Sequence, residues 1–290
     1  MSCANQAIRA HSVQNSRVLD LLARDGHVKA LSLKASKDNI EIVMEDVGRN
    51  KATTFEGFCS EHDSEIFRPI EENPIDISDE RHLFLLAYRA TVRELHVLMD
   101  AAIKIQATYG KRIELGLDTG NEPEPAGMFA INHILRAHST YLYKDYLDRA
   151  LQSQRYSDLL HRVITIHHKI PTIAVCSLYS IDNVQRDGDW VRVALNVFPI
   201  SETASAVVFS CAPNDSELVS ASLDRICNSE GHYQGYLVSR LILNNCENFV
   251  ISPAYYDQWT AEKQKDVLSY FTKTLHVGDL DVENQHFYLF

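Results

Sequence analysis

The longest regular pattern of apolar and polar positions lies in residues 79–109, where apolar side chains recur at the spacing of one helix face. The apolar positions that set this spacing are Leu83, Leu86, Ala90, Leu98 and Ile105. The pattern predicts one long helix with a wide apolar face. Residues 126–168 predict further helix in two pieces, and the glycines and prolines of residues 110–125 predict a loop between them.

The C-terminal half contains three apolar runs bounded by turn residues, at Thr172–Ile181, Val191–Phe198 and Ala204–Ala212. Runs of this length and spacing predict strands of an antiparallel meander. The remaining patterns of this half predict helices near 216–228, 236–243 and 260–275, with a short extended piece at 249–252.

The N-terminal quarter is richer in turns. Its predicted elements are a strand over 7–11, two strands of a hairpin near 40–44 and 53–58, and a helix over 59–67. Pro69 and Pro74 indicate an extended exit after that helix. The resulting fold class is α+β, with a small module over residues 1–75 and a body of helices and antiparallel sheet over residues 76–290.

Composition narrows the class of protein. The chain has 290 residues and contains no run of about 18 apolar residues, so no membrane partner is expected. No secretory signal is recognisable, so we expect a cytoplasmic protein. The net charge of −11 argues against a broad electrostatic surface for nucleic acid, although a bound divalent cation and a local basic patch could still attract it.

Candidate chemistry concentrates in the segment Cys59-Ser60-Glu61-His62-Asp63, which follows Gly57. A Gly-aromatic-Cys turn that leads into a short helix is how a zinc knuckle presents two ligands to one ion. Cys3 and His11 precede the predicted hairpin and offer two further ligands of the same kind. The order of these groups is that of a treble-clef zinc module.

These residues also carry a resemblance. The segments over 10–16 and 57–67 resemble the N-terminal signature of a group of uncharacterised bacterial proteins, and their order is similar to that of HNH endonucleases with a structural zinc. The resemblance covers about the first 75 residues. It implies an HNH-like ββα, treble-clef module and a metal-dependent nuclease, and a role in bacterial defence would suit such an enzyme.

The resemblance also implies roles for individual residues. Cys3, Cys59 and His62 would bind the structural Zn²⁺. His11 would be the general base that activates water, and Asp63 would hold the catalytic metal, Mg²⁺ or Mn²⁺. Asn15 or Asn50 would help to orient the site.

The chain departs from the HNH pattern because it has one N-terminal cysteine where the family has a pair. A fourth zinc ligand would then be a group such as His11, which in that place could not act as the base. An alternative is therefore a non-enzymatic, zinc-stabilised module whose α+β body binds a protein partner or a small ligand. A homo-oligomer is a further possibility.

Two other groups have alternative interpretations. Arg89 and Arg93 lie on a polar stripe of the long predicted helix, which is typical of a solvated face with internal ion pairs. They could instead face the module and contact phosphate or Asp63. Asp63 and Glu71 could likewise share a hard cation, or simply belong to an exposed acidic face.

Overall fold

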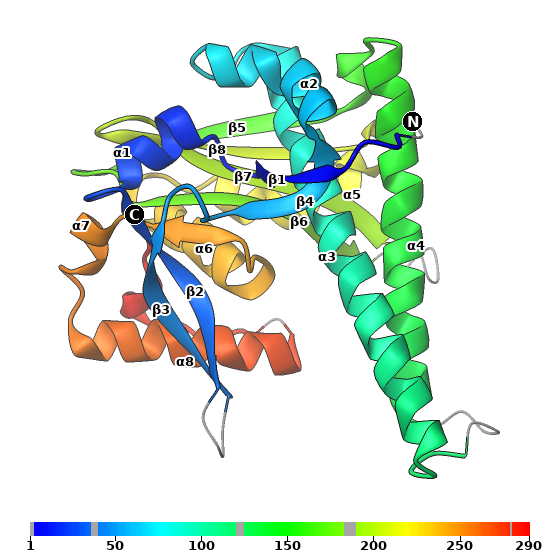
Figure 1. The fold of residues 1–290 in the computed structure, drawn as a ribbon. Coiled ribbons are helices and arrows are strands. Elements are labelled where there is room, and N and C mark those ends of the chain that lie inside the picture. The colour runs from blue at the N-terminus through cyan, green and yellow to red at the C-terminus, as the bar shows by residue number, and fades with distance from the viewer. Residues whose placement is uncertain (1–2, 36–39, 120–124, 183–189, 279) are drawn as a thin grey trace.

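A seven-stranded sheet runs through the centre of the molecule, with strand order β3-β2-β9-β6-β7-β8-β5 and antiparallel pairing throughout (Figure 1). The computed structural model describes residues 3–35, 40–119, 125–182, 190–278 and 280–290. The strands of the sheet are β2 (His27–Ala35), β3 (Ile40–Gly48), β5 (Leu160–His167), β6 (Ile173–Asp182), β7 (Trp190–Ser201), β8 (Ala204–Cys211) and β9 (Phe249–Ile251).

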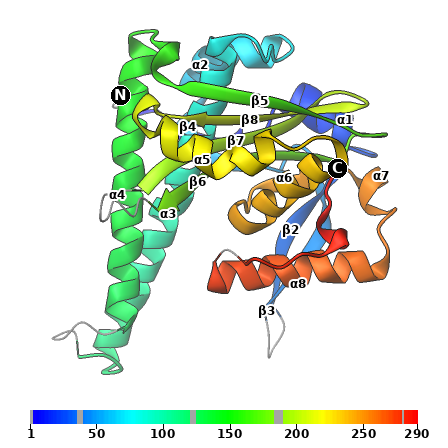
Figure 2. The ribbon, with the colours of Figure 1, turned by 180° about the vertical axis from the view of Figure 1, so that it is seen from behind.

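Helices cover both faces of the sheet (Figure 2). One face packs against α3 (Glu80–Glu114) and α4 (Pro125–Gln152), and the other packs against α5 (Ser216–Cys227), α6 (Gly231–Asn245) and α8 (Ala261–Val277). In β7, Val193 and Leu195 belong to the second core and Ala194 and Phe198 to the first. The central strands are therefore apolar on both faces, which explains their nearly unbroken apolar runs in the sequence.

Helices α3 and α4 form an antiparallel hairpin that reaches beyond the sheet (Figure 1). The first third of α3 lies in the core, where residues 83–92 are all buried. We call the part of the hairpin beyond the sheet, residues 97–114 of α3 and 125–142 of α4, the arm. Arg192 of β7 donates to the hydroxyl groups of Ser139 and Thr140 where the arm meets the sheet, and beyond that point the two helices depend chiefly on each other.

The residues of the cysteine- and histidine-containing segments meet outside this sheet. Strand β1 (Ala7–His11) pairs with β4 (Thr54–Cys59) in a separate two-stranded sheet, with Ala7 opposite Cys59 and His11 opposite Thr54. Helix α2 (Ser60–Glu72) follows β4 directly. The chain after β1 forms a short helical segment (Asn15–Leu19) that continues into α1 (Asp20–Leu22).

The predicted α+β class with antiparallel pairing is confirmed, as are the long helix and the meander of β6, β7 and β8. No helix in the described part of the chain is both long and apolar enough to span a membrane. Part of the predicted loop, residues 120–124, lies outside the described residues.

Some predicted elements differ from the structure, including residues 110–114 of the predicted loop, which belong to α3. Residues 160–167, predicted as helix, form the edge strand β5, which pairs with β8. Val163 packs against the core on one side of the sheet, and Ile164 and Ile166 pack against the core on the other side. The predicted hairpin of residues 40–58 does not form, because β3 pairs with β2 while β4 pairs with β1. Since β2 also pairs with β9, one sheet joins the expected N-terminal module to the body.

We predict that Phe84→Ala lowers the free energy of unfolding by about 3–5 kcal/mol, because it leaves a cavity in the core. The ring is fully buried, lies 6.3 Å from the ring of Tyr88 and meets that of Tyr156 edge-on at 5.5 Å. Leu33→Ala is the control, since Leu33 is 71% exposed and should change stability by less than about 0.5 kcal/mol. Chemical denaturation measures both, and equal effects would contradict this account of the core.

Candidate functional site

Two candidate sites lie beside the first turns of α2. Cys59 is the residue before the helix, and Asp63 follows one turn later. His11 ends β1, and Asn15 begins the helical segment after it. Pairing of β1 with β4 brings these two stretches together, although more than forty residues separate them in the sequence.

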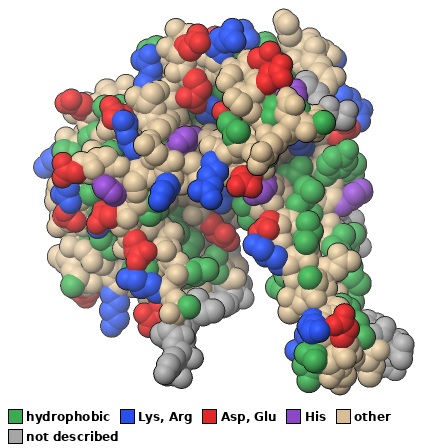
Figure 3. Space-filling model, in the orientation of Figure 1, with side chains coloured by type: hydrophobic (Ala, Val, Ile, Leu, Met, Phe, Trp, Pro, Cys, Tyr) green, Lys and Arg blue, Asp and Glu red, His purple; other side chains and the backbone are tan. Residues whose placement is uncertain are grey.

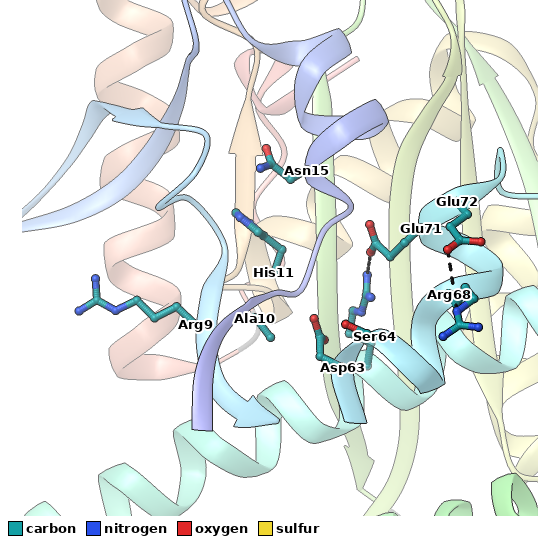
Figure 4. A pocket seen from close by; sticks show the side chains of 10 residues that line it. Arg9, Ala10, His11, Asn15, Asp63, Ser64, Arg68, Glu71 and Glu72 are labelled. Atoms are coloured by element: carbon teal, nitrogen blue, oxygen red, sulfur yellow. Dashed lines mark hydrogen bonds and ion pairs between the residues drawn. The ribbon is translucent and has the colours of Figure 1, made fainter. Parts of the chain in front are cut away.

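The first site is a cavity of about 360 Å³ between the end of β1 and α2 (Figure 4). It is lined by Arg9, Ala10, His11, Asn15, Asp63, Ser64, Arg68, Glu71, Glu72 and Arg89. The three residues proposed from the sequence as catalytic therefore line one cavity. We call it the His11 cavity.

His11 is held by the backbone of the neighbouring turn. Its Nδ1 lies 3.1 Å from the carbonyl oxygen of Ala52, which can only accept a hydrogen bond. Nδ1 must therefore carry a proton, and in the neutral ring Nε2 is left as an acceptor. Burial lowers the pKa of His11, and the hydrogen bond to Ala52 opposes this only in part, so the ring is neutral at pH 7.

Two oxygen atoms at the cavity have no hydrogen-bond partner among the described residues. They are Oδ1 of Asp63 and Oδ1 of Asn15, both shielded from solvent. Burial raises the pKa of Asp63, while the positive charge of Arg89 opposes the rise. Asn15 donates from Nδ2 to Oδ1 of Asn50 at 3.0 Å, which fixes the direction of its free oxygen. A buried carboxylate oxygen without a partner, such as Oδ1 of Asp63, is the kind of ligand that a hard divalent cation prefers.

Arg89 forms one wall of the cavity and is only 2% exposed. It donates to Oε1 of Glu71 at 2.6 Å, and its guanidinium lies 3.9 Å from the centre of the Phe67 ring. Asp63, Phe67 and Glu71 follow one another at four-residue steps on α2, so they share one face of the helix. The interpretation of Arg89 as part of a solvated face is therefore wrong.

The second site is the group of Cys3, Cys59 and His62, which we call the cysteine cluster. The two Sγ atoms are 3.7 Å apart, and Sγ of Cys59 lies 3.2 Å from Nδ1 of His62. Two sulfurs bound to one tetrahedral zinc ion at ~2.3 Å would be about 3.8 Å apart. The spacing of the thiols therefore fits a shared Zn²⁺, and both cysteines are free thiols.

The electrostatics of Cys59 favour the ligating form. Cys59 is the N-cap of α2, and the backbone N–H of His62 donates to its Sγ at 3.5 Å. This hydrogen bond, with smaller contributions from Cys3 and the His62 ring, lowers the pKa of the Cys59 thiol to about 7. A thiolate is the form that binds metal.

The structure separates His11 from the cysteine cluster. The cluster adjoins a cavity of about 250 Å³ whose lining includes Tyr88, Lys144 and Asp148 but not His11. Within the described residues the cluster has three members, so His11 does not take the place of a fourth ligand. His11 is therefore not required as a zinc ligand in this geometry, and its proposed role as a general base does not conflict with the cysteine cluster.

The sequence did not single out Arg9 and Arg68, which also line the His11 cavity. Arg9 alternates with buried Ala10 along β1, and Arg68 follows Ser64 by one helical turn. The sequence feature that could have pointed to them is their spacing: Arg9 lies two residues before His11 in β1, and Arg68 lies five residues after Asp63 in α2. It could be interpreted only once β1 and α2 were known to be neighbours.

Comparison with known proteins adds no assignment. The chain matches no protein-family model, and neither a curated protein nor a solved structure shows significant similarity to it. The likeness to HNH endonucleases therefore stays a prediction from the residues.

We predict that the purified chain binds about one Zn²⁺ and that Cys59→Ser removes it, because the substitution deletes the central ligand of the cluster. Cys227→Ser is the matched control, since Cys227 lies in α5 and outside the cluster. Elemental analysis after growth with added zinc measures the content. A zinc-free wild type would contradict the metal site.

We predict that Asp63→Asn raises the free energy of unfolding at pH 7. Burial raises the pKa of Asp63 in the folded protein above its value in the unfolded chain. The protonated carboxyl group is therefore tolerated in the fold at low pH, and the protein loses stability as pH rises through the folded-state pKa and the buried group becomes charged. Asparagine keeps the shape without the charge. The gain should vanish near about pH 3.5, where the carboxyl group is protonated in both states.

Chemical denaturation at both pH values measures this difference. Glu65→Gln is the control, because Glu65 is an exposed carboxylate on the same helix. A loss of stability in Asp63→Asn at pH 7 would show that the carboxylate has a structural partner and would argue against an open ligand position.

Proposed function

We propose that the protein is a metal-dependent hydrolase of nucleic-acid phosphodiesters, with the His11 cavity as its active site. The proposal is carried by one observation: His11, Asn15 and Asp63, selected from separate stretches of sequence, line a single cavity together with arginine side chains. We place this activity in the bacterial cytoplasm, in a role such as defence, on the strength of the resemblance alone.

In this proposal His11 is the general base. Its Nδ1–H donates to Ala52, so Nε2 of the neutral ring can accept a proton from water. The lowered pKa keeps the ring unprotonated at neutral pH, where a base must be free to accept. Its fixed orientation lowers the cost of reaching the reactive geometry.

Asp63 would hold the divalent cation, because its unpartnered carboxylate oxygen is the kind of hard ligand that Mg²⁺ and Mn²⁺ prefer, and Asn15 would help to orient the site. When bound, such a cation stabilises the negative charge that develops on a phosphodiester. Arg89 lies close enough to favour the ionised form of Asp63, and Glu71 holds Arg89 in place.

Arg9 and Arg68 would bind the phosphate backbone. Arg9 lies 3.8 Å from Glu56 and Arg68 lies 3.8 Å from Glu72, with both pairs largely exposed. Exposed pairs of this kind contribute only about 0–1 kcal/mol, so a phosphate could replace the carboxylate partners. A local basic rim would allow an otherwise acidic chain to approach nucleic acid.

We predict that the wild type nicks plasmid DNA or RNA with Mg²⁺ or Mn²⁺, and that His11→Ala and Asp63→Ala each lower the rate at least ~100-fold, since each removes a group acting in the transition state. His27→Ala is the control, because His27 is exposed in β2 and does not line the cavity. Equal rates for the wild type, His11→Ala, Asp63→Ala and His27→Ala would contradict the assignment of the His11 cavity as a nuclease active site.

The pH profile provides a second readout of the same prediction. Because burial lowers the pKa of His11, the rate should persist as pH falls past about 6.5, the ordinary value for histidine, and should decline only below it. A decline that begins well above this value would point to another group as the base.

A second candidate function is a non-enzymatic zinc module whose α+β body binds a protein partner or a small ligand. It is favoured by the separation of the cysteine cluster from the His11 cavity, because the cluster could stabilise the fold without any catalysis. In that case Cys59→Ala would destabilise the N-terminal segment, while His11→Ala would leave fold and partner binding unchanged.

A further inference from the structure

The outward face of α4 carries an apolar stripe without a partner among the described residues. Its large side chains are each 40–54% exposed: Met128, Ile131, Ile134, Leu135, Tyr141 and Leu142. Figure 3 shows hydrophobic side chains gathered along the outer side of the arm. We call these six residues the α4 stripe.

The inward face of α4 already has its partner. Ala130, Ala137 and Thr140 are buried, Thr140 also accepts a hydrogen bond from Arg192 of β7, and α3 is the main partner of α4. In the α4 stripe, Met128, Leu135 and Leu142 recur at seven-residue steps on the opposite side of the helix. A helix that is apolar on two opposite faces is normally covered on both.

Charge is also scarce on this part of the helix. Residues 125–143 contain one charged side chain, that of Arg136, in a chain in which charged residues make up 23% of the total. The stripe ends where Asp145 pairs with Arg149. An exposed helix on a projecting arm would normally carry many more charges, so this composition indicates an interface.

The area of the stripe suits a dimer. Six large side chains that are about half exposed present roughly 600 Å² of apolar surface, at the upper end of the largest patch on a typical monomer. A standard protein interface buries about 800 Å² on each partner. The stripe with a rim of neighbouring polar residues reaches that size.

We propose that the α4 stripe is a homodimer interface, in which the α4 helices of two copies pack antiparallel about a two-fold axis near Leu135. In this arrangement Leu135 meets its own copy and Met128 meets Leu142, so the seven-residue steps match in both chains. Such a contact is isologous, because the same surface serves both partners. The two arms together then form a four-helix bundle.

The oligomeric state of the full chain tests this proposal. Light scattering should give about twice 32.9 kDa for the wild type at micromolar concentration. Leu135→Glu should raise the dimer dissociation constant at least ~100-fold, because the dimer contains the buried charge twice. Leu33→Glu is the matched control at an exposed leucine in β2 and should leave the dimer intact.

Circular dichroism shows whether Leu135→Glu is folded. Ile131→Glu is a second variant, and we expect the same weakening of the dimer from it. A monomeric wild type at about 100 µM, far above the dissociation constant of a stable dimer, would overturn the proposal. Binding of a monomeric wild type to lipid vesicles, abolished by Leu135→Glu, would also overturn it by assigning the stripe to a membrane surface.

Cross-linking tests the orientation. In the antiparallel dimer, Met128→Cys together with Leu142→Cys should give an oxidised dimer band above the wild-type background, whereas Met128→Cys alone should not. A strong band from Met128→Cys alone would indicate parallel helices and would overturn the arrangement proposed here.

Discussion

The position of helix α2 depends on one buried guanidinium. Arg89 is almost completely removed from solvent, and a buried charge is tolerated only when it is paired and hydrogen-bonded. Glu71 supplies the carboxylate and Phe67 the ring face, both from α2. Because Arg89 itself belongs to the core helix α3, this contact ties α2 to the sheet-bearing body and fixes the direction in which its first turns point.

That fixed helix serves two sites with different chemistry. Cys59 stands at the N-terminus of α2, where the backbone N–H of His62 favours a thiolate, while Asp63 faces a cavity in which burial disfavours its charge. One helical turn separates a soft sulfur ligand from a hard oxygen ligand. If the proposed cations bind, each site would select its own kind without competing for the other.

The sequence contained the local elements but not their partners. The apolar runs of β6 to β8 and the period of α3 were readable because each element alone carries its pattern. The pairing of β1 with β4 could not be predicted, since β2 and β3 intervene in the chain and join another sheet.

Pro69 was expected to end α2, yet the helix continues to Glu72, because buried Ile70 and the contact of Glu71 with Arg89 favour the helical conformation there. His11 and Asp63 could be named from residue type, whereas Arg9 and Arg68 joined them only through tertiary packing.

One sheet contains strands from both the N-terminal and the C-terminal parts of the chain, and this has a practical consequence. β9, which has three residues, lies between β2 and β6 and is hydrogen-bonded on both sides. A shortened chain that starts at residue 76 would lose β2 and β3 and would leave β9 as a bare, apolar sheet edge. Such edges template intermolecular pairing, so the C-terminal portion would be expected to aggregate when expressed without the segment that precedes it.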